Sequence, residues 1–216
     1  MIRFENVTAC YTKDTGIFNL SFTILKSDMV FLMGPTGAGK STVLRAIIGD
    51  IPINSGKIFI DDQEIPRSNS RKISYFRRKV GTIFQDFKLI KNKTVYENIA
   101  LPLRITGTPG KIIREKVYEV LKQVDLTGKE KSMPLQLSGG EQQRVSIARA
   151  LVSEPLVILA DEPTGNLDPI VSDDIIDILE KAAQNGTTVL MSTHNYPLIR
   201  PRQKRFIELN KGYLIQ

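Results

Sequence analysis

The chain has 216 residues, of which 41% are apolar and 25% are charged, and this composition excludes an intrinsically disordered or fibrous protein. Its length fits a single domain, for which ~100–200 residues are usual. Lys and Arg number 30 against 23 Asp and Glu, a net charge of +7, which suits nucleic acid, an anionic membrane surface or a phosphate-rich ligand without choosing among them.

The cysteine content and the length of the apolar runs indicate the cellular compartment of the protein. Cys10 is the only cysteine, which excludes an intramolecular disulfide and favours a reducing compartment. The longest apolar runs, residues 29–33 and 156–160, are much shorter than the ~20 residues of a membrane-spanning helix. Because apolar residues alternate along 2–7 in the manner of a strand, we expect no signal peptide and a protein that stays in the cytosol.

Apolar periodicity predicts the secondary structure in chain order. Alternating or continuous apolar runs predict strands at residues 20–24, 29–33, 57–60, 80–84, 156–160 and 188–192. Helical spacing predicts helices around 43–48, 113–124 and 175–179, the last bounded by the cap residues Asp168 and Asn185. Strands separated by helices indicate an α/β fold with a mainly parallel sheet. We expect 1–85 and 155–216 to form the core of one domain spanning residues 1–216, with about 86–154 inserted as a helical subdomain.

A glycine-rich segment lies between a predicted buried strand and a predicted helix. It matches the phosphate-binding loop in residues and order, and consists of Gly34, Pro35, Thr36, Gly37, Ala38, Gly39, Lys40, Ser41 and Thr42. The glycines let backbone N–H groups surround phosphate oxygens, at which the helix directs its positive end. We expect Lys40 to reach the β- and γ-phosphates and Ser41 to bind Mg²⁺. A glycine-rich turn before an ordinary helix is the alternative.

Two carboxylates, Asp161 and Glu162, follow the predicted buried strand at 156–160. The carboxyl end of a strand is where ligands bind in open α/β sheets. We expect Asp161 to hold Mg²⁺, either directly or through one of its ligands, and Glu162 to orient and deprotonate an attacking water. An acidic pair that only caps the next turn is the alternative.

A third motif, residues 137–141, precedes an apolar helical stripe and narrows the class of triphosphatase. The spacing of Ser138 and Glu141 is that of a capping box, which predicts a helix start near Ser138. With Gly139 and Gly140 in its first turn, this helix would present bare N–H groups to a phosphate from outside its own fold. A well-capped surface helix is the alternative, although it does not explain the glycines.

At this point the sequence resembles the ATP-binding-cassette (ABC) ATPases over essentially its whole length. The motifs described above occur in the family's order, together with Gln85, the segment 166–168 and His194. The resemblance implies a P-loop NTPase fold with a RecA-like, mainly parallel sheet, an N-terminal antiparallel β part and a helical subdomain. It also implies an ATPase that uses ATP and Mg²⁺.

The resemblance assigns further roles residue by residue. Tyr11 is similar to the aromatic residue that stacks on adenine. Gln85 is similar to the glutamine that touches Mg²⁺, senses the γ-phosphate and links the core to the helical subdomain. His194, the only histidine, is similar to the switch histidine, which bonds the γ-phosphate and holds the geometry that Glu162 needs. The alternatives are a half-buried strand residue for Tyr11, a solvated loop glutamine for Gln85 and a structural histidine for His194.

In this family the signature of one subunit completes the phosphate loop of another. Ser138, Gly139 and Gly140, with Glu141 in the same segment, would therefore act in trans, and Asp168 would lie along the seam between the two subunits. A chain with one copy of each motif needs a second molecule to complete its ATP site. The resemblance thus implies an ATP-dependent head-to-tail homodimer.

Residues 84–89 and 94–98 closely resemble the FtsE-type cell-division ATPases. The ATPases of lipoprotein-release and macrolide-export complexes are the alternative. The resemblance implies an FtsX-like integral membrane subunit as partner, with a coupling helix that enters a groove beside Gln85, and a peripheral position at the cytoplasmic face of the inner membrane. It further implies that ATP-driven closure activates cell-wall hydrolysis.

Basic residues are concentrated between residues 67 and 93, and 67–79 contains no acidic residue. They are Arg67, Arg71, Lys72, Arg77, Arg78, Lys79, Lys88, Lys91 and Lys93. A solvated basic face is one interpretation, and contact with the anionic inner leaflet or with the partner's cytoplasmic loops is the other. A nucleic-acid partner is not expected, because the cassette relatives that act on nucleic acid carry long insertions or two cassettes, which 216 residues do not accommodate.

Overall fold

A six-stranded sheet, ordered β10-β9-β3-β8-β7-β6, runs through the middle of the computed structural model, which describes residues 1–66 and 70–215. Its strands are β3 (Met29–Met33), β6 (Val80–Phe84), β7 (Val157–Asp161), β8 (Thr188–Thr193), β9 (Phe206–Asn210) and β10 (Tyr213–Ile215). Neighbouring strands are parallel except for β9 and β10. The predicted α/β fold with a mainly parallel sheet is therefore confirmed.

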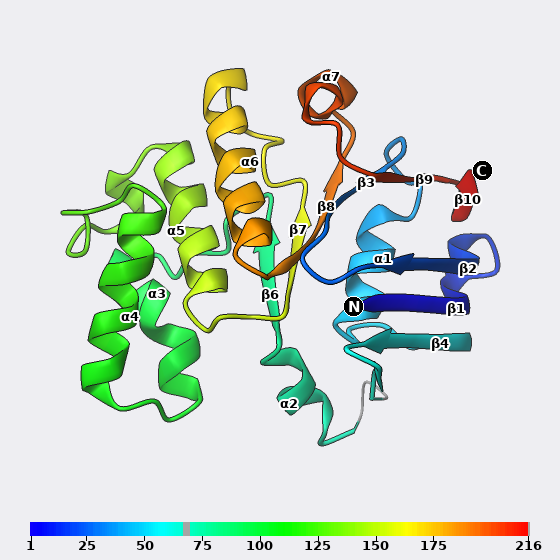
Figure 1. Cartoon of the computed structure of the whole chain (residues 1–216), viewed down its shortest axis with the longest axis horizontal. Helices are drawn as coiled ribbons and strands as arrows, with labels where there is room; N and C mark the ends of the chain where they lie inside the picture. The colour runs from blue at the N-terminus through cyan, green and yellow to red at the C-terminus, as the bar shows by residue number, and fades with distance from the viewer. Residues whose placement is uncertain (67–69, 216) are drawn as a thin grey trace.

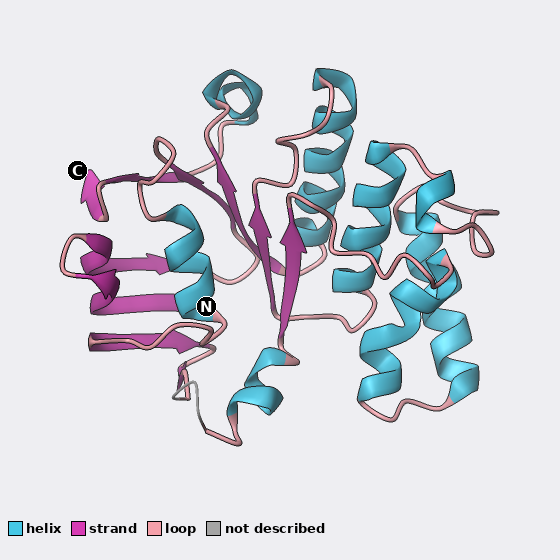
Figure 2. Cartoon of the chain, turned by 180° about the vertical axis from the view of Figure 1, so that it is seen from behind, coloured by secondary structure: helices cyan, strands magenta, loops and turns pink. Residues whose placement is uncertain are grey.

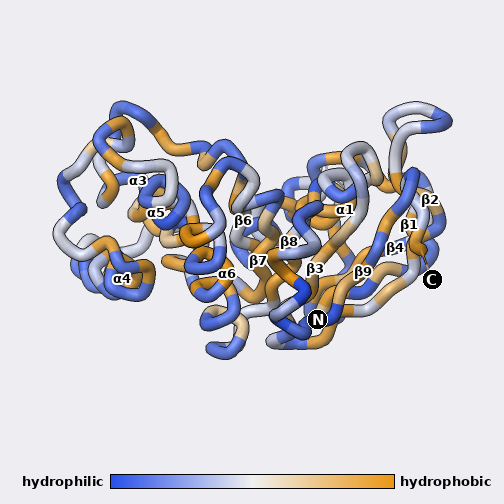
Figure 3. The backbone as a smooth tube through the Cα atoms, turned by 90° about the horizontal axis from the view of Figure 1, so that it is seen from above, coloured by the Kyte–Doolittle hydropathy of each residue, from blue (hydrophilic) through white to orange (hydrophobic). Residues whose placement is uncertain are grey.

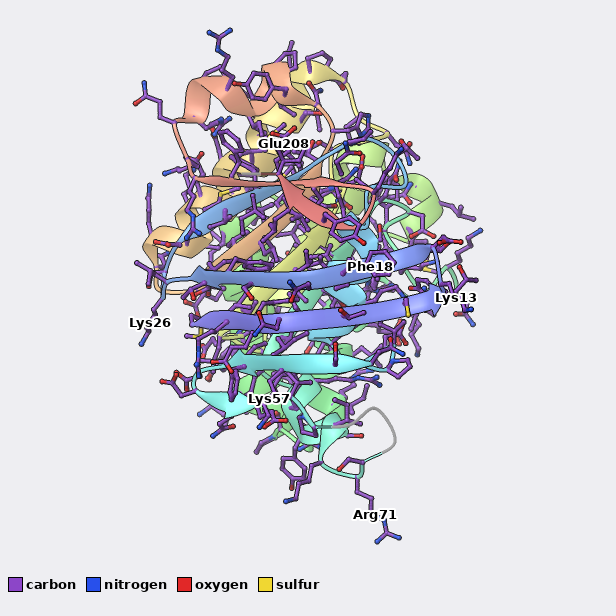
Figure 4. The ribbon with its side chains drawn as sticks, turned by 90° about the vertical axis from the view of Figure 1, so that its right-hand side faces the viewer. Lys13, Phe18, Lys26, Lys57, Arg71 and Glu208 are labelled. Atoms are coloured by element: carbon purple, nitrogen blue, oxygen red, sulfur yellow. The ribbon has the colours of Figure 1, made fainter. Side chains whose placement is uncertain are left out.

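A separate antiparallel sheet, ordered β2-β1-β4-β5, is built from strands in the N-terminal part of the chain (Figure 4). Its strands are β1 (Ile2–Thr12), β2 (Thr15–Ile24), β4 (Ser55–Ile60) and β5 (Gln63–Glu64). Helix α1 (Lys40–Ile47) lies between this sheet and the parallel one (Figure 1). This is the antiparallel part that the family resemblance implies.

Residues 86–154 hold helices and no strand, and they form one end of the molecule (Figures 1 and 2). These helices are α3 (Val95–Ile105), α4 (Gly110–Gln123), the short 3₁₀ helix η1 (Pro134–Gln136) and α5 (Gly139–Leu151). Helix α6 (Pro169–Gln184) connects β7 to β8, and α7 (Tyr196–Ile199) with the 3₁₀ helix η2 (Arg200–Arg202) connects β8 to β9. None of the helices in the described ranges combines the length and apolarity needed to cross a bilayer.

Strand β3 is buried on both faces and separates two hydrophobic clusters. Met29, Phe31 and Met33 belong to the cluster that includes residues of α3, α4, α5 and α6, whereas Val30 and Leu32 belong to the cluster that includes α1 and the antiparallel sheet. Figure 3 shows the hydrophobic segments along the central strands and hydrophilic loops at the periphery. Burying both faces excludes water from the central strands, so only their carboxyl ends open onto a site.

Sequence periodicity missed several short elements. Strands β5, β9 and β10 and helix α2 (Ile73–Arg77) have two to five residues each, which is too short for a repeat of 2 or 3.6 residues to stand out. The basic segment that includes Arg67 lies partly outside the described residues, because the structure does not describe 67–69.

Candidate active site

Four parallel strands deliver the candidate catalytic residues to one edge of the sheet. The phosphate loop follows β3, Gln85 follows β6, Asp161 and Glu162 end β7, and His194 follows β8. They surround a cavity of about 460 Å³, which is lined by Thr15, Gly16, Thr36, Gly37, Ala38, Gly39, Lys40, Ser41, Thr42, Gln85, Asp161, Glu162 and His194. The structure thus brings together the candidates for phosphate binding, metal binding and water activation within one chain.

The phosphate loop requires glycine for its backbone geometry. Gly34, Gly37 and Gly39 have φ angles of 143°, 81° and 102°, which residues with a side chain rarely adopt. A Cβ at Gly34 would lie 2.2 Å from the Leu209 carbonyl oxygen, so this loop also has no room for a side chain there. The loop is therefore shaped around the space where phosphate oxygens would bind.

Lys40 begins α1 and is only 5% exposed. Its Nζ donates to the carbonyl oxygens of Gly34 (2.7 Å) and Pro35 (3.2 Å) and lies 3.3 Å from Glu162 Oε1. A buried ammonium group needs such partners because it has lost its hydration. Lys40 therefore connects the phosphate loop to the carboxylate that follows β7.

Asp161 and Glu162 are held in different ways. Asp161 Oδ1 accepts hydrogen bonds from Ser41 Oγ (3.2 Å) and Ser192 Oγ (2.6 Å). Glu162 has a left-handed φ of 46°, and its two carboxylate oxygens contact Lys40 Nζ and His194 Nδ1. Asp161 is thus tied to the phosphate loop, whereas Glu162 projects into the cavity with a restrained orientation.

The oxygen atoms of Ser41, Asp161 and Gln85 fit a magnesium site, since Mg²⁺ prefers hard oxygen ligands and keeps several waters. Within the described ranges no three His, Cys, Asp or Glu side chains form a metal cage. A site with one carboxylate and one hydroxyl matches the Mg²⁺ sites that depend on substrate phosphates for their remaining ligands.

Gln85 lies between this cavity and the loop after Glu162. Its Nε2 donates to Asn166 Oδ1 (3.3 Å), and Asn166 Nδ2 donates to the Gln85 carbonyl oxygen (3.4 Å). A Cβ on Gly165 would lie 2.8 Å from Gln85 Nε2, so the Gln85 side chain lies close to the backbone at 165. Gln85 is exposed, and its contact with Mg²⁺ stays a prediction.

Tyr11 lies near the end of β1 and does not line the cavity, although Thr15 and Gly16 at the start of β2 do. Its ring is half exposed, and the Arg45 guanidinium carbon lies 5.6 Å from the ring centroid. A half-exposed ring leaves one face for stacking. Adenine stacking on Tyr11 stays a prediction.

The signature residues cap α5, away from this cavity. Ser138 Oγ accepts from the Glu141 N–H (3.2 Å), and the Glu141 carboxylate accepts from the Ser138 N–H (2.9 Å). That backbone hydrogen bond, with Lys129 Nζ 2.9 Å away, holds the pKa of the Glu141 carboxyl below its usual value. The predicted capping box is confirmed, and none of residues 138–141 lines the cavity of its own chain.

Asp168 caps the next helix, α6, by accepting a hydrogen bond from the Val171 N–H (3.0 Å). The start of α6 lies against the start of α5, because a Cβ on Gly140 would lie 2.6 Å from Val171 Cγ1. Gly140 is therefore needed for close packing between these two helix ends. Asp168 lies beside the signature rather than in the cavity.

Two residues of the site region were missed by motif reasoning. Ser192 lies in the buried strand β8, one residue before its end, and faces Asp161 in the parallel register of β7 and β8. A polar residue directly after the apolar run of a buried strand is the signal that could have identified it. Arg149 lies on α5 four residues after Val145 of the apolar stripe, which places a cation on the buried side of the helix. Its contacts are with the segment after Gln85.

Comparison with known proteins agrees with this geometry. The sequence profile described as ABC transporter matches residues 17–165. The chain belongs to the ABC transporter family. It is an ATPase cassette of that family, as the sequence predicts.

Full-length relatives carry a cell-division name. The chain is 46% identical over 215 residues to the cell division ATP-binding protein FtsE of Escherichia coli K12, covering 99% of this chain and 97% of that protein. It is 43% identical over 218 residues to FtsE of Mycobacterium tuberculosis and 42% identical over 217 residues to FtsE of Bacillus subtilis, covering 100% of this chain and 95% of each relative. The predicted likeness to FtsE is therefore confirmed.

Solved cassettes share the whole fold. The cbiO1 protein of Clostridium perfringens, described as part of the ABC transporter complex cbiONQ, is 28% identical with a TM-score of 0.92 and covers 100% of this chain and 86% of its own. The cassette MJ0796, solved as a dimer, is 36% identical with a TM-score of 0.88, covering 100% and 97%. A second dimeric structure of that cassette, described as a post-hydrolysis state bound to ADP and Pi, has a TM-score of 0.87.

Proposed function

We propose that this chain hydrolyses ATP with the residues gathered at the carboxyl ends of β3, β6, β7 and β8. Lys40 and the backbone N–H groups of the phosphate loop bind the β- and γ-phosphates. Glu162 accepts a proton from the attacking water, and its orientation is supported by the contacts of its two oxygens with Lys40 Nζ and His194 Nδ1. Mg²⁺, when bound at Ser41, Asp161 and Gln85, neutralises charge that develops on the phosphates.

The role of His194 follows from the nitrogen that it uses. Nδ1 contacts Glu162, which leaves Nε2 for the γ-phosphate or for water. His194 is therefore a positioning group for Glu162, in agreement with the expectation that it holds the geometry and does not act as the base. A purely structural histidine would not be 57% exposed at the edge of this cavity.

One observation carries the proposal that the active unit is a head-to-tail dimer. Gly139 has no positive φ, and a Cβ there would meet its nearest neighbour, Leu167, at an ordinary 3.5 Å. The fold of a single chain therefore does not require glycine at this position. Glycine at the start of α5 instead keeps the N–H groups open to a ligand from outside, which we assign to the ATP held by the phosphate loop of a second copy.

Mixing two inactive variants tests the shared site. Lys40→Ala removes the phosphate-binding half and Gly139→Glu blocks the signature half, so each variant alone should have little ATPase activity. An equimolar mixture should recover about a quarter of the wild-type rate, because half of randomly formed dimers are mixed and each mixed dimer has one intact site of two.

The matched control combines two variants of the same half. Lys40→Ala mixed with Glu162→Gln leaves no intact site in any dimer, so this mixture should stay inactive. If the Lys40→Ala and Gly139→Glu mixture is also inactive while wild-type chain hydrolyses ATP, each site is complete within one chain and the dimer proposal is wrong.

We further propose that the chain works in cell division with an integral membrane subunit of the FtsX kind, at the cytoplasmic face of the inner membrane. Identity of 40–46% over the full chain to proteins named FtsE supports this choice over lipoprotein release or macrolide export. Capture of the partner from detergent-solubilised membranes, with this chain as bait, tests it. A transmembrane partner typical of an exporter would overturn the cell-division assignment.

A further inference from the structure

The turn after Gln85 contains two residues in a conformation that favours glycine. Phe87 and Lys88 have φ angles of 58° and 50°, in the left-handed region where a side chain raises the free energy. The turn is closed locally by hydrogen bonds from the Phe87 N–H to the Phe84 carbonyl oxygen (3.2 Å) and from the Lys88 N–H to the Asp86 carbonyl oxygen (2.6 Å). Such a backbone persists only where its surroundings hold it.

Arg149 of α5 supplies that support. Its two terminal nitrogens donate to the carbonyl oxygens of Phe87 (2.9 Å) and Lys88 (2.6 Å). No carboxylate within residues 1–66 and 70–215 forms an ion pair with Arg149, and desolvation lowers the pKa of its guanidinium. The protein thus keeps a desolvated cation whose observed hydrogen bonds are all made to this turn.

The other end of the same segment is held by α3. Asn98 is fully buried, accepts a hydrogen bond from the Ile90 N–H (2.8 Å) and donates to the carbonyl oxygens of Ile90, Lys93 and Thr94. Two helices therefore fix the segment from Phe87 to Thr94. Gln85, two residues before Phe87, is the point where this fixed segment meets the cavity.

We propose that Arg149 is a positioning residue for ATP hydrolysis, which acts by holding the Phe87–Lys88 turn so that Gln85 faces the metal and phosphate site. The inference rests on the proposed ATPase function and adds a residue to it. Because Arg149 and Gly139 belong to the same helix, a movement of the signature helix is transmitted to Gln85 through this guanidinium.

A double-mutant cycle with Gln85→Ala tests the proposal. Arg149→Lys keeps the charge but loses the planar pair of donors. We expect it to lower kcat about tenfold and to raise the Mg²⁺ concentration needed for half-maximal rate, while the Kd for ATP changes less than about twofold. In the Gln85→Ala background, Arg149→Lys should have little further effect on kcat, because both changes act on the same group.

Arg144→Lys is the matched control on the same helix. Arg144 also donates to a backbone carbonyl oxygen, that of Val124 (3.1 Å), but it pairs with Asp125 and Asp174 and has no recorded bond to the turn after Gln85. In the double variant, the fold-loss of kcat should equal the product of the losses caused by Arg144→Lys and by Gln85→Ala alone. If the lysine variant at 149 unfolds, Arg149→Gln, whose amide can donate to one carbonyl, is taken through the same cycle.

Two outcomes overturn the inference. If the fold-loss of kcat in the double variant equals the product of the losses caused by Arg149→Lys and Gln85→Ala alone, Arg149 acts independently of Gln85. An unchanged kcat in a folded Arg149→Lys variant would show that the turn needs no such support. Failure of the proposed function itself is distinguishable, since wild-type chain would then show no hydrolysis in the same assay.

Discussion

At the scale of single residues, the two carboxylates of the site depend on Ser192. Its hydroxyl donates to Asp161 Oδ1 (2.6 Å) and accepts from the Glu162 N–H (2.9 Å), and the residue is fully buried. The Ser192 hydroxyl therefore orients the side chain of Asp161, which we expect to bind the metal, and the backbone of Glu162, whose side chain we expect to activate water. Hydrogen bonds that orient metal ligands typically change metal affinity or activity by 10–100-fold when removed.

We therefore expect Ser192→Ala to lower kcat/KM for MgATP about 10–100-fold and to decrease the free energy of unfolding by about 1–2 kcal/mol. Steady-state ATPase assays across Mg²⁺ concentrations and urea unfolding measure the two effects. Ser146→Ala is the control, because Ser146 is also fully buried but its Oγ has no hydrogen-bond partner in the described part of the chain. Equal losses in both variants would mean that Ser192 matters only for packing.

Among the helices, α3 and α5 both begin with a capping box. Thr94 and Ser138 each accept from a glutamate N–H at 3.2 Å, and Glu97 and Glu141 each accept from the cap residue's N–H at 2.9 Å. Those backbone bonds lower the pKa of both glutamates from 4.5. Since the folded-state pKa values are depressed, this stabilisation is present above pH 4.5 and is lost as the pH falls through the lower values.

The two capping boxes differ in the expected role of the helix N-terminus, so substitutions in the two caps should have different effects. Thr94→Ala and Ser138→Ala should each lower the free energy of unfolding by about 1 kcal/mol near neutral pH, because both remove one cap hydrogen bond. Only Ser138→Ala should also lower the ATPase rate, since in the proposed dimer α5 alone presents its N-terminus to the ATP of a second copy. An equal fall in rate for both would indicate that helix stability, and not phosphate contact, limits turnover.

At the scale of the whole molecule, basic groups at α2 extend from one end of the body. Arg77 is used internally, because it donates to the carbonyl oxygens of Ile48 and Gly49. Arg71, Lys72 and Arg78 are exposed and form no ion pair with the residues that the structure describes. Figure 4 shows Arg71 projecting away from the sheets. The exposed set is suited to an anionic surface, as the second interpretation of the basic segment requires.

We expect the wild-type chain to float with vesicles that contain phosphatidylglycerol and not with pure phosphatidylcholine vesicles. Replacing Arg71, Lys72 and Arg78 with Gln should weaken binding by about two orders of magnitude, at ~1 kcal/mol for each charge. The control replaces Arg200, Lys204 and Lys211, which are equally exposed and lie around α7 and β9, away from α2 (Figure 1). If both triple variants bind equally, net charge alone explains the attraction and the basic end of α2 is a solvated face.

Local sequence patterns were sufficient to predict the class of fold and most residues of the candidate catalytic site. Strand β3 is a continuous apolar run that a glycine-rich loop follows, and the apolar run of β7 is followed by a carboxylate pair. Local pattern alone therefore predicts Lys40, Asp161 and Glu162 as site candidates. The signature helix was predictable for the same reason, because its capping box spans only four residues. These features are encoded over short stretches of chain, where propensity and periodicity act.

The side chains that support the candidate site became visible only in the folded molecule. Ser192 meets Asp161 across 31 residues, and Arg149 meets Phe87 across 62. The structure also showed that a Cβ on Gly139 would meet Leu167 at an ordinary 3.5 Å, whereas a Cβ on Gly140 would lie only 2.6 Å from Val171. Contacts of this kind depend on the register of paired strands and on how helices pack over them, and neither leaves a period in the local sequence.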